Sequence, residues 1–257
     1  AGALLATGLA VNAEPIALPD ALKKASESSP RISQAKAQAE AAEARARQAG
    51  VSPNPELGLE IENFGGSGPY RDFRSSETTL ALSQRIELGG KRGARIAVAA
   101  AERDFALLAY KRAVADLERD VRVAHAELRA AEDRAILARD ATGSAQELAR
   151  TAGILVDAGR DPPLRQLRAE AVLAEAKAEQ ARTFGQLLTA RRLLSSLIGS
   201  SDSELMAVAV SDEIAPSILP ADTVTLDEQL AVAEREAAQA RVRVAKADAV
   251  PDVTASG

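Results

Sequence analysis

From residue 93 to about residue 158 the sequence keeps a single helical pattern, with no proline in more than sixty residues. At a rise of 1.5 Å per residue, a helix of that length would measure about 100 Å. Its large apolar residues are sparse and separated by alanines, which is typical of helices packed closely in antiparallel pairs. The motif GRDPPL at residues 159–164 predicts a tight turn, because glycine favours a helix C-terminus and proline a first helical turn. A return helix over residues 164–198 completes a predicted helical hairpin.

The composition supports long helices rather than a thick globular core. Hydrophobic residues make up 46% of the 257 residues but aromatic residues only 2%, and alanine supplies much of the apolar fraction. Alanine-rich chains with many arginines and glutamates form long, closely packed helices. The net charge is −5 and the basic residues are mixed with acidic ones, so no nucleic-acid partner is predicted. The lack of cysteine fits an oxidising or envelope compartment and excludes thiolate metal sites.

The first thirteen residues, AGALLATGLAVNA, are small and apolar. They resemble the second half of a secretory signal peptide, with Val11 and Ala13 at the −3 and −1 positions of a cleavage site. We therefore expect residues 1–13 to be a signal-peptide remnant and the sequence to be truncated at its N-terminus. The alternative is an ordinary short helix of alanine and leucine.

Two segments, at residues 54–63 and 76–88, alternate between apolar and polar residues, and a loop at 64–75 joins them. This pattern predicts a β-hairpin. One of its faces is aliphatic, and we expect that face to contact lipid through Leu57, Leu59, Ile61, Leu80, Leu82 and Ile86. A two-stranded unit is only marginally stable in water, whereas transmembrane barrels show this alternation in segments of about ten residues. A barrel built from one hairpin per chain would have to be shared between chains.

The end of the sequence repeats its beginning at a spacing of 196 residues. Residues 40–57 align with residues 236–253 at eight of eighteen positions, and Pro55 aligns with Pro251. A strand should therefore begin after Pro251, and a second hairpin and helix pair should follow it. We expect the sequence to be truncated there as well.

Between the second strand and the long helix stand two glycines and a group of cations, namely Gly89, Gly90, Lys91, Arg92 and Arg95. Glycines permit the change of direction from strand to helix. Positive charge at a helix N-terminus opposes the helix dipole, so something other than local helix stability should favour it. One possibility is pairing with Glu87 or Glu102. A phosphate-binding loop is a poor fit, because GGKRG lacks the upstream glycine and the Ser or Thr after the lysine.

These features follow one another in a definite order: helix, a P-N-P strand, a glycine-rich loop, a strand ending in LSQRIELGGKRGAR, the long helix, a tight turn, a return helix and a repeat of the opening. That order resembles the TolC-type outer-membrane factors of tripartite efflux systems. The stretch SQRIELGGKRGARI is most similar to the branch that serves heavy-metal and cation efflux, the cobalt–zinc–cadmium and copper–silver systems. The resemblance covers roughly residues 18–257, but a second hairpin and a second long helix pair are missing from the pattern.

The resemblance implies a mainly α fold with a β-hairpin, in which long antiparallel helical hairpins form a periplasmic α-barrel and the strands join a trimeric transmembrane β-barrel. It implies a homotrimer in the outer membrane of a Gram-negative cell, extending into the periplasm, with four strands per protomer in a twelve-stranded barrel. The expected segments are a signal-peptide remnant (1–13), N-terminal periplasmic helices (14–53), an outer-membrane hairpin (54–88) with an external loop (64–75), a periplasmic helical hairpin (89–199), an equatorial segment (200–225) and a truncated second repeat (226–257).

The resemblance also implies roles for particular residues. The turn between the long helices would contact the periplasmic adaptor, or membrane fusion protein, through Gly159, Arg160, Asp161, Pro162, Pro163 and Leu164. The alternative is a capped turn that has no partner. The cations after the second strand would lie where barrel and tunnel meet, facing phosphates of outer-membrane lipid.

The expected function is a passive exit duct for heavy-metal cations, driven by an inner-membrane RND transporter acting through the adaptor. His125 is the lone histidine and has no His, Cys or Met three or four residues away, so it is expected to pack or to be solvated rather than to bind metal. No catalytic arrangement, cofactor or metal site is predicted. The alternative function is a soluble periplasmic coiled-coil adaptor or scaffold, against which the hairpin argues because an adaptor's sheet domains need several more strands.

Overall fold

The computed structural model describes residues 14–63, 65, 67–68, 76–200, 205–208 and 224–257. The expected signal-peptide remnant, most of the loop at 64–75 and most of the segment at 200–225 lie outside the described residues. The chain divides into two compact units, one of residues 1–32 with 113–218 and one of residues 33–112 with 219–257. Within the described ranges, no helix combines the length and the apolar character that crossing a membrane requires.

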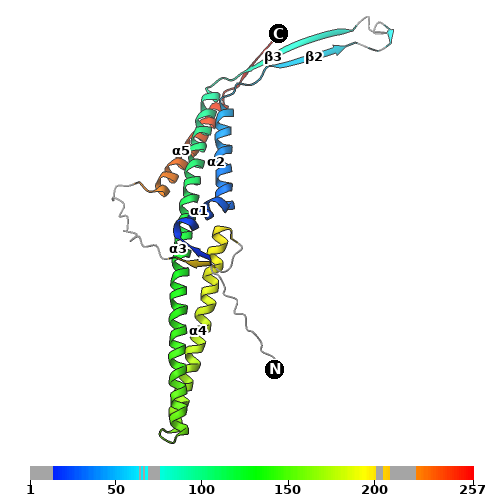
Figure 1. Ribbon diagram of the computed structural model, residues 1–257. Coiled ribbons are helices and arrows are strands. Elements are labelled where there is room, and N and C mark those ends of the chain that lie inside the picture. Colours follow the sequence, from blue (N-terminus) through cyan, green and yellow to red (C-terminus); the bar gives the residue numbers. More distant parts are fainter. Residues whose placement is uncertain (1–13, 64, 66, 69–75, 201–204, 209–223) are drawn as a thin grey trace. The chain divides into compact units, whose positions relative to one another are not determined.

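The long helical hairpin has the extent that the sequence predicts (Figure 1). Helix α3 runs without interruption over 67 residues, Lys91–Asp157, and helix α4 returns over 36 residues, Pro163–Ile198. The hydroxyl of Thr142 in α3 donates to the carbonyl of Ala176 in α4, at 3.1 Å, so the two backbones lie close together. The absence of large side chains in this part of the pair makes that distance possible.

Some of the apolar residues of α3 form a buried seam over residues 113–131, whereas others, such as Ile136 and Leu137, are exposed. The residues of the seam recur at intervals of three and four, which places them on a single face of the helix. The residues of this seam are Ala113, Leu117, Val121, Ala124, Leu128 and Ala131. Leu187, Leu194 and Ile198 are their buried counterparts on α4. Alanine therefore acts here as a core residue, because close helix packing leaves room for little more than a methyl group.

The first unit contains a two-stranded parallel sheet, and the lone histidine of the sequence forms a hydrogen bond with one of its strands. Strand β1 (Glu14–Ile16) pairs with β4 (Leu205–Ala207), and helix α1 (Leu18–Ser28) follows β1. His125 is buried on α3, and its Nε2 lies 3.1 Å from the carbonyl oxygen of Ile16. Since a carbonyl can only accept, Nε2 carries the proton in this bond. His125 thus packs, as expected, and it also fastens β1 to the long helix.

The second unit contains α2 (Pro30–Ala49), the first part of α3 and α5 (Leu226–Asp248). Helix α5 begins with a capping box, in which Thr225 and Glu228 exchange side-chain and backbone hydrogen bonds. The bonds donated by the N–H and the hydroxyl of Thr225 hold the pKa of Glu228 below its ordinary value. The buried residues of α5 are again alanines, namely Ala233, Ala237 and Ala240.

The β-structure of the second unit is a three-stranded antiparallel sheet in the order β2-β3-β5. Strand β2 (Glu56–Glu62) pairs with β3 (Glu77–Ile86), which forms the predicted hairpin. Strand β5 (Val253–Ser256) pairs with the end of β3, with Val253 opposite Ile86. The prediction that a strand begins after Pro251 is therefore confirmed.

Gly199 gives a test of the packing between α1 and α4. It ends α4 with a φ of 66°, and a Cβ added there would lie 2.6 Å from the Cβ of Ser28. We expect Gly199→Ala to destabilise the protein by about 1–3 kcal/mol, because it adds both backbone strain and a steric clash. The measurement is thermal unfolding of the protein in detergent, followed by circular dichroism.

The matched control is Gly185→Ala in the same helix, where a Cβ meets nothing within 4 Å. It should stabilise the helix by up to about 1 kcal/mol, since alanine has the higher helix propensity. Equal unfolding temperatures for the two variants would contradict the proposed contact between Gly199 and Ser28.

Candidate functional site

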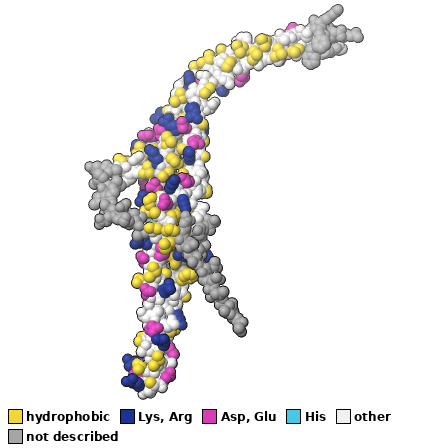
Figure 2. Space-filling model, viewed as in Figure 1, with side chains coloured by type: hydrophobic (Ala, Val, Ile, Leu, Met, Phe, Trp, Pro, Cys, Tyr) yellow, Lys and Arg dark blue, Asp and Glu magenta, His cyan; other side chains and the backbone are white. Residues whose placement is uncertain are grey.

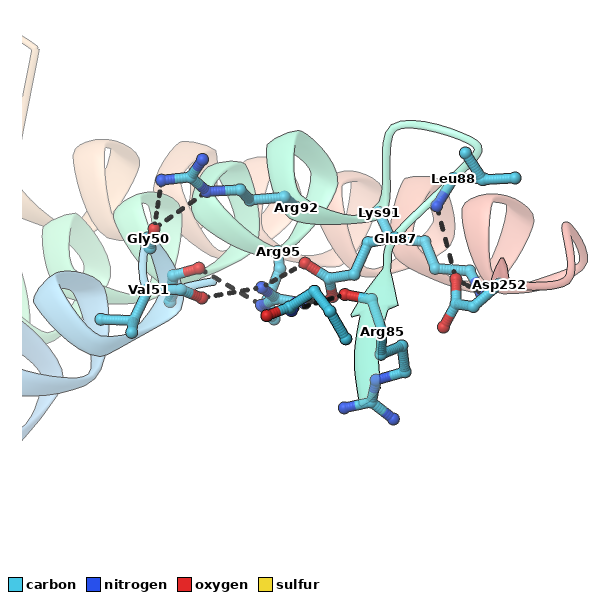
Figure 3. A network of polar contacts seen from close by, with 11 residues as sticks. Gly50, Val51, Arg85, Glu87, Leu88, Lys91, Arg92, Arg95 and Asp252 are labelled. Carbon is cyan, nitrogen blue, oxygen red and sulfur yellow. Dashed lines mark hydrogen bonds and ion pairs between the residues drawn. The ribbon is translucent and has the colours of Figure 1, made fainter. Parts of the chain in front are cut away.

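The junction between β3 and α3 holds a network of polar contacts in the second unit (Figure 3). Strand β3 ends at Ile86, and the chain then turns through Gly89 and Gly90, whose φ angles are 67° and 72°. A Cβ at Gly89 would lie 2.7 Å from the Cβ of Val250. Glycine is therefore required there both by backbone conformation and by the close approach of the segment after α5.

Two cations of the junction bind the C-terminal end of α2. Arg92 donates two hydrogen bonds to the carbonyl of Gly50, at 2.9 and 2.6 Å, as Figure 3 shows. Arg95 donates to the carbonyls of Ala49 and Val51, at 3.2 and 3.3 Å. The last carbonyls of a helix have no partner within the helix and form the negative end of its dipole. The cations are thus placed unfavourably for α3 but favourably for α2.

Arg95 also forms a two-pronged ion pair with Glu87, just after the end of β3. Its Nη2 lies 3.0 Å from Oε2 of Glu87, and its Nη1 contacts Oε1. The sequence offered pairing of these cations with Glu87 or Glu102 as one possibility. Arg95 does pair with Glu87, whereas Glu102 pairs with Arg241 of α5. The predicted contact with lipid phosphates stays a prediction.

Lys91, the third cation of the junction, binds a residue of the second repeat. Nζ of Lys91 lies 2.7 Å from Oδ1 of Asp252, and that oxygen also accepts from the N–H of Leu88 at 3.4 Å. Lys91 and Asp252 expose only 13% and 25% of their side chains. The ammonium group holds the pKa of Asp252 below its ordinary value. Asp252 is not among the site residues predicted from the sequence, because nothing near it in the sequence marks it as the partner of Lys91.

The aliphatic residues of the sheet share one exposed face. The register sets Leu57 opposite Leu82 and Leu59 opposite Leu80, and opposed residues in antiparallel strands lie on the same face. The six predicted residues are between 47% and 69% exposed, and Figure 2 shows hydrophobic side chains following the strands. Val253, opposite Ile86, extends this face onto β5, and its alignment with Leu57 in the repeat could have revealed it.

The opposite face of the hairpin is polar and acidic. It carries Glu56, Glu60, Glu62, Glu77 and Arg85. The sheet is therefore amphipathic, and no other described part of the chain covers its aliphatic face. An exposed apolar surface of this size marks a contact with a membrane or with another protein.

Four of the six predicted tip residues, Gly159 to Pro162, lie in the turn between α3 and α4, and Pro163 and Leu164 are the first two residues of α4. Arg160 donates from its N–H to the carbonyl of Leu155 and Gly159 to that of Val156, both at 2.9 Å, which is a Schellman motif with Gly159 at φ 67°. Asp161 accepts from Arg165 at 2.9 and 3.0 Å. Three large apolar residues stay exposed at this end, namely Ile154, Leu164 and Leu167. The turn is rigid, charged and partly apolar.

A groove of about 790 Å³ lies between α3 and α4 beside β4, with Ile136, Phe184 and Met206 in its lining. Burial raises the pKa of Glu132 at its rim, although the N–H of Ala207 donates to that carboxylate at 3.3 Å. The remaining rim mixes cations with one further carboxylate. In the described part of the chain, no group of three or more histidine, aspartate or glutamate side chains is placed to hold a metal ion.

Long alanine-packed helices beside an amphipathic sheet with an uncovered aliphatic face indicate a protein whose sheet contacts a membrane or a further protein chain. Residues 21–200 match the family described as outer membrane efflux protein. The chain belongs to this family. That result confirms the sequence-based identification and the predicted outer-membrane location, and it argues against the soluble adaptor alternative.

Relatives with assigned roles support the same assignment. The chain is 34% identical to the nickel and cobalt resistance protein CnrC of Cupriavidus metallidurans, over 98% of this chain and 61% of that protein. It is 30% identical to the nickel-cobalt-cadmium resistance protein NccC of Alcaligenes xylosoxydans xylosoxydans, over 97% of this chain and 58% of that protein. The chain thus spans about three fifths of the length of these relatives.

Among solved structures, CusC superposes with a TM-score of 0.74 at 20% identity, over 93% of this chain and 58% of that chain. The report of that structure concerns folding and transmembrane channel formation. At this level of identity the likeness establishes the fold, and it confirms the predicted fold class.

Asp252 gives a pH-dependent test of the junction. Because its pKa is lowered in the folded protein, the pair with Lys91 stabilises the fold above the ordinary pKa of an aspartate and is lost as the pH falls through the lowered value. Asp252→Asn should therefore lower the unfolding temperature at pH 7, and the difference from the wild type should shrink as the pH falls through the lowered pKa of Asp252.

Lys91→Met should reproduce this pH dependence, since it removes the partner. Glu60→Gln, on the exposed polar face of β2, is the control and should change the unfolding temperature little at any pH. A difference between Asp252→Asn and wild type that does not change with pH would contradict the role of the ion pair.

Proposed function

We propose that this protein is the outer-membrane exit duct of a tripartite efflux system. The observation that carries the proposal is the uncovered aliphatic face on three strands whose opposite face is acidic and polar. Lipid can cover the first face and a water-filled lumen can solvate the second, which is the alternation of a transmembrane barrel. Family membership supports this reading.

The sheet of one chain has two open edges, on β2 and on β5, so a barrel needs further strands. We propose that three copies of the protein supply them and that the long helices continue the barrel as a periplasmic tunnel. In this arrangement residues 54–88 form the outer-membrane hairpin, residues 89–199 the periplasmic helical hairpin and residues 200–225 an equatorial segment. The junction at Gly89–Arg95 would then lie at the periplasmic surface of the membrane, near lipid phosphates.

Leu82 and Ala81 offer a matched test of the lipid-facing assignment. They are neighbours on β3 whose side chains lie on opposite faces of the sheet. Leu82→Asp in the full-length protein should abolish assembly in the outer membrane, because a carboxylate in the hydrocarbon region costs on the order of 2–3 kcal/mol per copy. Ala81→Asp, which would face the lumen, should assemble normally. The measurement is the amount of heat-modifiable oligomer in the outer-membrane fraction, and equal amounts for the two variants would refute the assignment of faces.

The proposed cargo is a divalent heavy-metal cation. The support is the naming of two relatives as resistance proteins for nickel and cobalt and for nickel, cobalt and cadmium. We propose that the chain performs no chemistry and holds no cofactor. Energy would come from an inner-membrane RND transporter, and selection of the metal would take place in the partner proteins.

We propose that the turn from Gly159 to Leu164 contacts the periplasmic adaptor. Its Schellman motif and the ion pair of Asp161 with Arg165 fix the loop, so an exposed set of charged and apolar side chains is presented with little conformational freedom. A preorganised loop loses little entropy on binding, which suits a docking surface.

Asp161→Lys tests this role against a purely structural one. It should reduce metal efflux and cross-linking to the adaptor by at least about tenfold, equivalent to about 1.4 kcal/mol, while the yield of assembled oligomer stays unchanged. Glu147→Lys is the control, because Glu147 forms the same kind of short-range pair with Arg150 on α3, away from the turn. Loss of folding in Asp161→Lys, or equal efflux by both variants, would show that the turn is merely structural.

A further inference from the structure

The groove between α3 and α4 is formed by one face of each helix. On α3 its lining residues stand at positions 129, 132, 133, 135, 136 and 139, and on α4 at positions 177, 180, 181, 184, 187 and 191. Spacings of three and four residues place most of each set on one face of its helix. Positions 177 and 191 are fourteen residues apart, so the groove extends about 21 Å along α4. Its volume of about 790 Å³ is in the range of sites that hold small organic ligands.

The apolar part of the groove is exposed to solvent. It is lined by Ile136 of α3, Phe184 of α4 and Met206 of β4, whose exposed fractions are 58%, 55% and 43%. An apolar surface that stays exposed in a concave site can bind the apolar body of a ligand.

One end of the groove is positively charged. Helices α3 and α4 are antiparallel, and the bond from Thr142 to Ala176 shows which parts of them lie side by side. Arg139 and Lys177 therefore lie at the same end of the groove, next to this bond. Neither side chain has a hydrogen bond or ion pair with any described residue. Two cations without a carboxylate partner make this end attractive to an anion.

The other end of the groove lies beside β4 and is more nearly neutral. Its two cations, Arg129 and Arg191, share it with the carboxylates Glu132 and Asp133. The N–H of Ala207 in β4 donates to Glu132 at 3.3 Å. Nε of Arg191 is buried and has no acceptor among the described residues. A buried donor without a partner is rare in native structures, so a group bound in the groove would complete this wall.

We propose that this groove binds an organic anion that has an elongated apolar body and an acidic head group, a carboxylate or a phosphate. Arg139 and Lys177 would bind the head group, because both cations lack a protein partner and hydrogen bonds between ionised groups are strong. The body of the ligand would cover Ile136 and Phe184 and remove them from water.

The ligand is inferred to be soluble rather than a lipid of the bilayer. In the proposed duct α3 and α4 lie in the periplasm, so a lipid held in the membrane would not reach the groove. The inference rests on the proposed function in this respect alone, because all the lining residues belong to the first unit of the chain.

Photo-labelling of the full-length protein tests the proposal. The protein is purified in amphipol, so that no free detergent competes, and is irradiated with dodecanoic acid that carries a diazirine in its chain. Mass spectrometry should find the label on the segments around Ile136 and Phe184. The corresponding alcohol has the same body without the charge and should label these segments at least about tenfold less, since hydrogen bonds to charged groups are the stronger ones.

Removal of the two cations should have the same effect as removal of the charge on the ligand. Arg139→Ala combined with Lys177→Ala should reduce labelling by the acid at least about tenfold. Arg134→Ala is the control, because Arg134 is an exposed arginine of α3 that lines a different groove. It should be labelled as the wild type is. Equal labelling by acid and alcohol, or equal loss in the double variant and the control, would overturn the proposal.

Ala181→Trp gives an independent readout, because it places a large side chain in the groove without removing a charge. It should abolish the labelling, whereas Gln186→Trp on the same helix, which faces the neighbouring groove, should not. Labelling that persists in Ala181→Trp would contradict the site. So would a wild-type protein that takes up no label, which is the result expected if a second copy of the protein covers the groove.

The two proposals fail in distinguishable ways. If the full-length protein forms an outer-membrane oligomer whose groove takes up no acid, the duct stands and the ligand site is refuted. If the protein is soluble and monomeric but is still labelled by the acid in preference to the alcohol at Phe184, the duct is refuted and the ligand site stands.

Discussion

The binding of helix ends by the start of α3 is the interaction on which the second unit depends. Arg92 and Arg95 bind the carbonyls that end α2, while Lys91 binds Asp252 after α5. A single turn of helix is thereby bonded to the end of α2, to Glu87 after β3 and to Asp252 before β5. The arrangement also explains why cations tolerate the unfavourable end of the α3 dipole, since they lie at the favourable end of the α2 dipole.

The helices contact one another along narrow lines of small buried residues rather than around a thick hydrophobic core. Alanines and single leucines fill the contacts of α3 with its neighbours, and the hydrogen bond from Thr142 to Ala176 shows how closely the backbones approach. Such packing buries little apolar area per residue. A long interface is therefore needed to bury the area that a thick core would bury in a shorter one. Large apolar residues stay exposed on α3, α4 and α5, among them Ile136, Leu167 and Val242, and they are available to neighbours in the proposed assembly.

Much of the fold could be predicted from the periodicity of apolar residues and from the positions of proline and glycine. The proline-free run gave the long helix to within two residues at each end, and the alternating segments gave the hairpin with its aliphatic face. The strand after Pro251 followed from the repeat alone. Periodicity could not predict which residues far apart in the sequence bond to one another. Nothing local to Asp252 marks it as the partner of Lys91, 161 positions away, and nothing local to His125 marks Ile16 as its acceptor.

The most direct test of the whole account is the mass and location of the full-length protein expressed with its signal peptide. The envelope would be separated into inner and outer membranes, and the protein extracted in detergent and weighed by light scattering. The account predicts a particle of three copies from the outer membrane. A monomer recovered in the soluble periplasmic fraction would contradict it, because the aliphatic face of the sheet would then have neither lipid nor a second copy to cover it.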